Sequence, residues 1–143
     1  MDPLLQTAAG HLQAGRLAEA DSACRAVLAR RPADAPATHI LGLVERRRGR
    51  LDEAERLLRL SVDLEPRNPE FRSNFGQLLA ARGQPDTGLQ QLEQAVRLDP
   101  RFRPARLGLS RLANQLGRSA LAESHARALV ASNPRDSEAW SAL

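Results

Sequence analysis

The sequence predicts an all-α protein, an α-solenoid built from stacked antiparallel helix hairpins. Glycines and prolines recur in two independent series with the same spacing of 34 residues, and apolar residues between them recur at three- and four-residue steps. A constant period of roughly 20 to 50 residues is the signature of repeat architectures, and three- and four-residue steps indicate helices. The two series are Gly15, Gly49, Gly83 and Gly117, and Pro32, Pro66, Pro100 and Pro134.

The period divides the chain into four complete repeats within one domain, 1–143. The repeats cover 1–34, 35–68, 69–102 and 103–136, and 137–143 forms either part of a fifth repeat or a capping helix. Within each repeat we expect one helix near positions 2–14 and a second near positions 18–31. Glycine at position 15 ends the first helix because it readily adopts left-handed dihedral angles. Proline at position 32 ends the second.

Helix starts are marked by side chains that can cap them. Asp2, Asp34 and Asn68 each come one or two residues before a proline, and an N-cap oxygen followed by proline in the first turn favours a helix start. The fourth repeat lacks such a cap, because Phe102 stands just before it. The partial fifth repeat has Asp136 in the capping position.

Small residues recur where the two helices of a repeat face each other, at positions 8 and 20. A side chain larger than methyl there would push the backbones apart. Larger apolar residues at positions 7, 24, 28 and 30 fill the space between hairpins. The first and fourth repeats depart from this pattern, and we expect them to pack less tightly, because smaller or polar residues replace apolar ones at Thr7, Cys24, Arg30, Ala126 and Ser132.

This pattern resembles the tetratricopeptide repeat (TPR): it has a small residue at position 8, glycine at 15, a small residue at 20 and proline at 32, on an uninterrupted 34-residue period. The resemblance covers essentially the whole chain and implies a right-handed superhelix that acts as a protein–protein interaction scaffold. It also implies that the first helix of each repeat lines a concave groove for a peptide or protein segment. The groove residues that it implies are Leu5, Ala9, Leu12, His39, Leu43, Arg46, Arg47, Ser73, Asn74, Gln77, Leu107, Arg111, Asn114 and Gln115.

That groove is apolar at one end and rich in arginine and amides beyond it, so we expect a partner with apolar anchors and some acidic character. Two known uses of the family do not fit. The clamp for the acidic tail of heat-shock chaperones needs Lys and Asn where this chain has Leu5 and Ala9. The asparagine ladder of O-linked N-acetylglucosamine transferases needs Asn at position 6 of every repeat, and only Asn74 provides it.

Composition argues against nucleic acid as the partner. The net charge is +4, with 21 arginines, no lysine and 17 acidic residues spread among them. An all-arginine composition is typical of a GC-rich bacterial genome. The densest basic run is 46–50, but acidic residues follow it at once, which favours a solvated helix end. Few aromatic residues are present to stack on bases.

The sequence does not predict an enzyme, and we expect no catalytic, cofactor or metal site. His11, His39 and His125 lie on different hairpins or faces and cannot converge on one metal. Cys24 and His11 face each other within one hairpin, and we interpret them as a packing pair rather than a nucleophile and its base. No glycine-rich loop could cradle a phosphate.

We expect a cytoplasmic protein. Its apolar runs are shorter than the roughly 18 residues needed to span a bilayer, its start lacks a signal peptide, and its one cysteine cannot form an internal disulfide. Because the last helix stops at Leu143, one alternative is the N-terminal arm of a larger bacterial enzyme of the sulfotransferase, glycosyltransferase or hydroxylase type. Another is a homodimer through the C-terminal helix, which carries Trp140.

Overall fold

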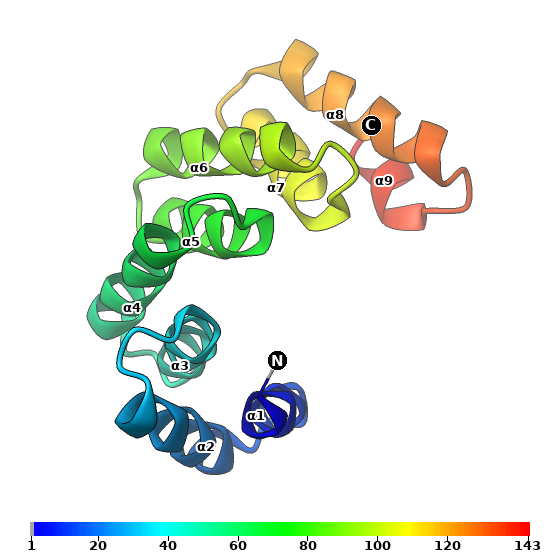
Figure 1. Cartoon of the computed structure of the whole chain (residues 1–143). Helices are drawn as coiled ribbons and strands as arrows, with labels where there is room; N and C mark the ends of the chain where they lie inside the picture. The colour runs from blue at the N-terminus through cyan, green and yellow to red at the C-terminus, as the bar shows by residue number, and fades with distance from the viewer. Residues whose placement is uncertain (1) are drawn as a thin grey trace. The chain divides into compact units, whose positions relative to one another are not determined.

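Residues 2–143, which the computed structural model describes, form nine α-helices joined by short turns (Figure 1). These described residues divide into two compact units, which we call unit 1 (up to Pro66) and unit 2 (from Arg67 on). Unit 1 contains α1 (Pro3–Gln13), α2 (Leu17–Arg30), α3 (Ala35–Arg47) and α4 (Leu51–Leu64). Unit 2 contains α5 (Pro69–Ala81), α6 (Pro85–Leu98), α7 (Arg103–Gln115), α8 (Ser119–Ser132) and α9 (Ser137–Ser141).

The eight longer helices pair into four hairpins, two in each unit, in which consecutive helices pack on each other. The all-α repeat of helical hairpins predicted from the 34-residue period is therefore confirmed. Helix boundaries fall within one or two residues of those expected. The right-handed superhelix stays a prediction. None of the helices in residues 2–143 combines the length and apolar character that crossing a bilayer requires.

The predicted helix caps are present. Asp2 accepts a hydrogen bond from the Leu4 amide at 2.8 Å, and Asp34 accepts one from the Ala37 amide at 2.9 Å. Asn68 accepts one from the Phe71 amide of α5 at 3.2 Å. By contrast, Phe102 at the start of α7 makes no such bond. These caps satisfy amides that have no partner inside the helix.

Each hairpin turns at a glycine with a positive φ, which lies between 73° and 82° at repeat position 15. No other described residue has a positive φ. Side chains rarely adopt this left-handed conformation, so glycine is required at the turn. In the first hairpin the amide after the glycine, that of Arg16, donates to the carbonyl of His11 at 2.8 Å and closes the end of α1.

Small residues bring the two helices of a hairpin together as the sequence predicts. A Cβ placed on Gly88 of α6 would lie 2.6 Å from the carbonyl oxygen of Gly76 on α5, and one placed on Gly76 would lie 2.8 Å from that of Gly88. In the last hairpin Ser110 holds the equivalent place, and its hydroxyl donates to the Ala122 carbonyl at 3.0 Å. Positions 8 and 20 therefore set the separation of the helices.

The core of each unit is aliphatic. In unit 1, Leu5, Val27 and Leu41 are among the buried residues that join the two hairpins, and in unit 2 Leu92 and Leu109 have this role. The end hairpins have less extensive helix contacts, since α1–α2 contact is smaller than α3–α4 and α7–α8 smaller than α5–α6. This matches the looser packing expected of the first and fourth repeats.

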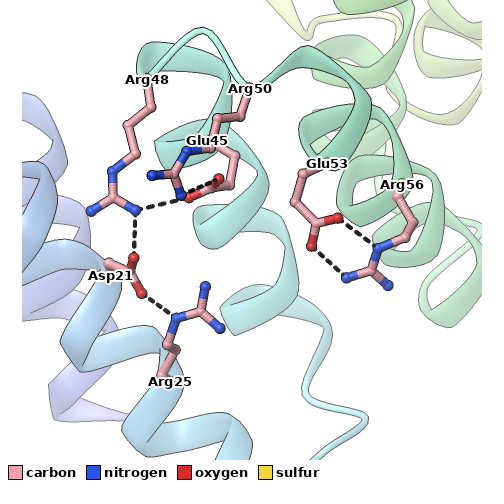
Figure 2. A network of polar contacts seen from close by, with 7 residues as sticks. All are labelled: Asp21, Arg25, Glu45, Arg48, Arg50, Glu53 and Arg56. Atoms are coloured by element: carbon pink, nitrogen blue, oxygen red, sulfur yellow. Dashed lines mark hydrogen bonds and ion pairs between the residues drawn. The ribbon is translucent and has the colours of Figure 1, made fainter.

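A network of ion pairs joins the two hairpins of unit 1 (Figure 2). Asp21 of α2 accepts hydrogen bonds from Arg25 and from Nη1 of Arg48, at the end of α3. The same Nη1 lies 2.9 Å from Oε1 of Glu45, and Arg50 Nη1 lies 3.3 Å from Oε2. Glu45 is only 1% exposed. Arg48 therefore ties α2 to a buried carboxylate on α3.

Candidate functional site

An open hollow of about 360 Å³ lies on the surface of the first helices of unit 1. Its lining residues are Leu12 of α1 and Leu43, Arg46 and Arg47 of α3. The two leucines are half-buried, so each presents part of an apolar side chain to solvent. We call this surface the unit 1 hollow.

Arg46 is the distinctive group of the unit 1 hollow. Burial lowers the pKa of its guanidinium, which is half-buried. No carboxylate in residues 2–143 lies within ion-pair distance of it. Arg47 is exposed and donates from Nη1 to the Leu12 carbonyl at 3.1 Å. The hollow thus combines partly exposed leucines with a positive charge that the unit does not neutralise.

The basic run 46–50 therefore has two roles rather than one. Arg48 and Arg50 bind Glu45 and belong to the ion-pair network, while Arg46 and Arg47 line the hollow. The sequence-based interpretation of the whole run as a solvated helix end is wrong for Arg48, because its side chain is only 22% exposed and its charge is paired.

A second open hollow, of about 390 Å³, lies in unit 2 between α5, α6 and α7. Its lining is mostly apolar and includes two amides and two arginines. We call this surface the unit 2 hollow. Its lining residues are Gln77, Ala80, Ala81, Leu92, Arg103, Pro104, Leu107, Gly108, Arg111, Leu112 and Gln115.

The arginines of the unit 2 hollow are already paired. Arg103 donates from Nε and Nη2 to the two carboxylate oxygens of Asp136, at 2.6 and 2.8 Å. This pairing, together with the capping bond from the Ala139 amide, lowers the pKa of Asp136 to about 2. Arg111 Nη2 lies 3.1 Å from Oε2 of Glu138 in α9, and both side chains are more than half exposed. Bidentate pairs are the stronger kind, so Arg111 is the more available of the two.

Eight of the fourteen residues predicted for the groove line one of the two hollows. Leu12, Leu43, Arg46 and Arg47 lie together in unit 1. In unit 2 the hollow brings together Gln77, Leu107, Arg111 and Gln115, although Leu107 is mostly buried beneath it, at 6% exposed.

Three other predicted groove residues are buried instead. Leu5 is 1% exposed, His39 3% and Ser73 1%. The structure removes them from the candidate surface, because helix positions inferred from a family pattern do not show which residues neighbouring helices cover. Ala9 packs against the unit 1 core. Asn74 and Asn114 lie outside the lining of both hollows.

Sequence reasoning missed two important members of the unit 2 hollow, Arg103 and Gly108. One signal for Gly108 was available. It occupies repeat position 6, where the other repeats have Gln6, Ile40 and Asn74. A glycine on a helix surface can mark a place where a ligand approaches the backbone. Whether a hollow forms there depends on the neighbouring helices, which the sequence pattern does not place.

Cys24 and His11 are the reactive side chains that the sequence places opposite each other within the first hairpin. Cys24 is buried, and burial raises the pKa of its thiol to about 12. His11 accepts a hydrogen bond from Arg16 Nε at 2.9 Å through Nδ1. Within residues 2–143, no three side chains of the His, Cys, Asp or Glu type come together as metal ligands.

Paired helices on a 34-residue period define an α-helical repeat protein. The chain matches the tetratricopeptide repeat family over residues 5–69 and again over residues 79–143. It therefore belongs to the tetratricopeptide repeat family, whose domains are in general protein–protein interaction modules. No curated protein is a significant match to the chain.

Solved structures similar to this chain support the same fold. An O-GlcNAc transferase of Thermobaculum terrenum is 32% identical, with a TM-score of 0.79 over 87% of this chain and 25% of that enzyme. PilF of Pseudomonas aeruginosa is 22% identical, with a TM-score of 0.89 over 96% of this chain and 63% of its own length. YrrB, a TPR protein with an unusual peptide-binding site, is 20% identical, with a TM-score of 0.78 over 99% of this chain and 73% of its own. The chain thus spans only a quarter of the transferase.

Proposed function

We propose that the chain is a binding module that holds an acidic peptide segment with apolar anchors on the surface of its first helices. The observation that carries this proposal is Arg46, a half-buried guanidinium without a carboxylate partner in residues 2–143, beside the partly exposed leucines of the unit 1 hollow. The similarity in fold to YrrB, which has a peptide-binding site, supports a ligand of this kind.

The argument is electrostatic. Partial burial removes water from a charged group, and that cost remains unless an opposite charge approaches. A partner carboxylate placed on Arg46 would form a charge-assisted hydrogen bond, which is stronger than one between neutral groups. An aliphatic side chain of the partner, next to that carboxylate in the peptide, would cover Leu12 and Leu43. The two interactions together specify an acidic residue next to an apolar one.

Selection from a displayed random-peptide library against the full chain tests the proposal. We expect enriched peptides to carry an aliphatic residue beside Asp or Glu, and to bind Arg46→Gln at least ten-fold more weakly, since a hydrogen bond to a charged group contributes about 1.5–3 kcal/mol. Arg97→Gln is the matched control, because it removes the same charge from an exposed position in α6. Equal weakening by both substitutions would show a non-specific charge effect and refute the assignment of Arg46.

A second candidate is that this chain serves as the repeat arm of a larger bacterial enzyme. The similarity to a quarter of an O-GlcNAc transferase favours it, because the matching region of that protein is joined to much additional chain. Immunodetection of the native polypeptide in the source cells tests this candidate. A mass near 15.6 kDa, that of the 143 residues, would exclude it.

A further inference from the structure

The unit 2 hollow has the composition of a side-chain pocket. Leucines and alanines line it together with the amides of Gln77 and Gln115. None of the described residues that line it is acidic, whereas Arg103 and Arg111 are basic. Its volume of about 390 Å³ exceeds that of one aliphatic side chain, so it can admit one together with part of the peptide backbone.

Gly108 is the residue of α7 that lines this space without a side chain of its own. A Cβ placed on Gly108 would lie 3.2 Å from Cδ2 of Leu92 and 3.7 Å from Nε2 of Gln77. The 3.2 Å distance is shorter than an ordinary contact, so Leu92 packs directly on the α7 backbone at Gly108, and a methyl group there would press on Leu92. Glycine inside a helix is unfavourable by about 0.5–1 kcal/mol relative to alanine. The missing side chain of Gly108 permits this close packing of Leu92, which is a contact with a side chain and not a close approach of two backbones.

A carboxylate of the chain itself already binds Arg111. Glu138 of α9 places a carboxylate oxygen 3.1 Å from Arg111 Nη2, and the pair is exposed on both sides. An exposed pair of this kind is weak, usually below about 1 kcal/mol. A carboxylate on a bound peptide could therefore replace Glu138 at little cost. Arg103 is held by both oxygens of Asp136 and is less available.

We propose that the unit 2 hollow binds an aliphatic side chain of the partner, inserted beside Gly108, with an adjacent carboxylate of that partner replacing Glu138 on Arg111. The inference rests on the proposed function and names a second site for the same kind of peptide. It assigns Gly108 as the residue that determines which side chain fits. Glu138 is then an internal competitor of the ligand.

The experiment uses the isotope-labelled full chain and the probe acetyl-Asp-Leu-Asp-amide, titrated by NMR. Two control probes replace either both Asp residues with Asn or the Leu with Ala. Amide shifts at Gly108, Arg111 and Gln77 report on the unit 2 hollow, and those at Leu43 and Arg46 report separately on the unit 1 hollow. We expect shifts at Gly108 with the Leu-containing acidic probe, and at least ten-fold weaker binding of the Ala probe, because burying a leucine contributes about 1.5–3 kcal/mol.

Two substitutions with opposite expected effects make the test specific. Gly108→Ala presses on Leu92 in the lining of the hollow and leaves less room for the inserted side chain, so it should weaken binding of the probe about three- to five-fold, the equivalent of one buried methylene. The new methyl meets side-chain atoms and no backbone atom, so a small shift of Leu92, which is 1% exposed, must accommodate it, and far-ultraviolet circular dichroism checks that the fold is kept. Glu138→Gln removes the carboxylate that pairs with Arg111 and should strengthen binding of the probe about two- to five-fold. The matched controls are Gly10→Ala, where no described atom lies within 4 Å of the added Cβ, and Glu123→Gln, which breaks the exposed pair with Arg127.

The outcomes separate this inference from the proposed function. Shifts at Leu43 and Arg46 without shifts at Gly108 would overturn the inference and leave the proposed function standing. Absence of shifts at both hollows would overturn both. Weaker binding to Glu138→Gln, or unchanged binding to Gly108→Ala, would also contradict the inference, since each variant was chosen for a defined effect on the hollow.

Discussion

The close approach of α5 and α6 at two glycines makes a quantitative prediction for Gly88→Ala. The added Cβ would lie 2.6 Å from the Gly76 carbonyl oxygen and 3.0 Å from the Ala80 amide nitrogen. Both are backbone atoms, so the helices must separate by about 0.8 Å to reach the 3.4 Å at which ordinary contact begins. Overpacking of this kind costs about 1–3 kcal/mol. Alanine offsets about 0.5–1 kcal/mol of this through its higher helix propensity.

We therefore expect Gly88→Ala to lower the free energy of unfolding by about 1 kcal/mol, within a range of about 0–2.5 kcal/mol. The measurement is equilibrium unfolding in urea, followed by far-ultraviolet circular dichroism. The matched control is again Gly10→Ala in α1, where the added methyl meets open space and only the propensity gain of about 0.5–1 kcal/mol applies. Opposite signs for the two substitutions would support the structure. Stabilisation by Gly88→Ala would refute the reasoning about the backbone contact.

Three further predictions concern titratable and charged groups. Burial lowers the pKa of His39 to about 4, so the unfolded chain binds more protons than the folded chain between pH 4 and about 6.5. As the pH falls through that window, the folded chain should lose about 3 kcal/mol of stability because of His39. Measurements of unfolding at several pH values should show that His39→Gln abolishes this loss. Glu45→Gln should destabilise the chain by about 1–3 kcal/mol in urea unfolding, because Glu45 is buried against Arg48 and Arg50. The control is Glu53→Gln, which breaks the more exposed pair with Arg56 in Figure 2 and should cost less than about 1 kcal/mol. Cys24 should resist a disulfide reagent in the native state and react fully in denaturant, because its thiol is buried with a pKa raised to about 12; rapid native-state labelling would contradict its burial.

Most of the fold could be predicted because its determinants are local. Proline and glycine act on the backbone of their own residue, and Asp34 caps a helix three residues away. The positive φ at Gly15 and at its three counterparts follows from the same local rule. Even the contact between Gly76 and Gly88 could be predicted, because a helix hairpin joined by a short turn places positions 8 and 20 opposite each other.

The candidate surface could be predicted only in part. The sequence pattern identified Leu43, Arg46 and Arg111 as residues of the first helices, and these do line the hollows. It also included His39 and Ser73, which are buried. A helical period describes one helix, whereas exposure depends on every helix that packs around it.

The sequence by itself determined the repeat length, the number of hairpins and the position of each turn, because these follow from interactions within a few residues. Only the tertiary structure decided which arginines remain available to a partner. Arg48 meets Asp21 and Arg103 meets Asp136 across sequence separations of 27 and 33 residues, while Arg46 meets no carboxylate of the described chain. Charge pairing depends on distances of a few ångströms in space, and those distances are set by how one hairpin packs on the next.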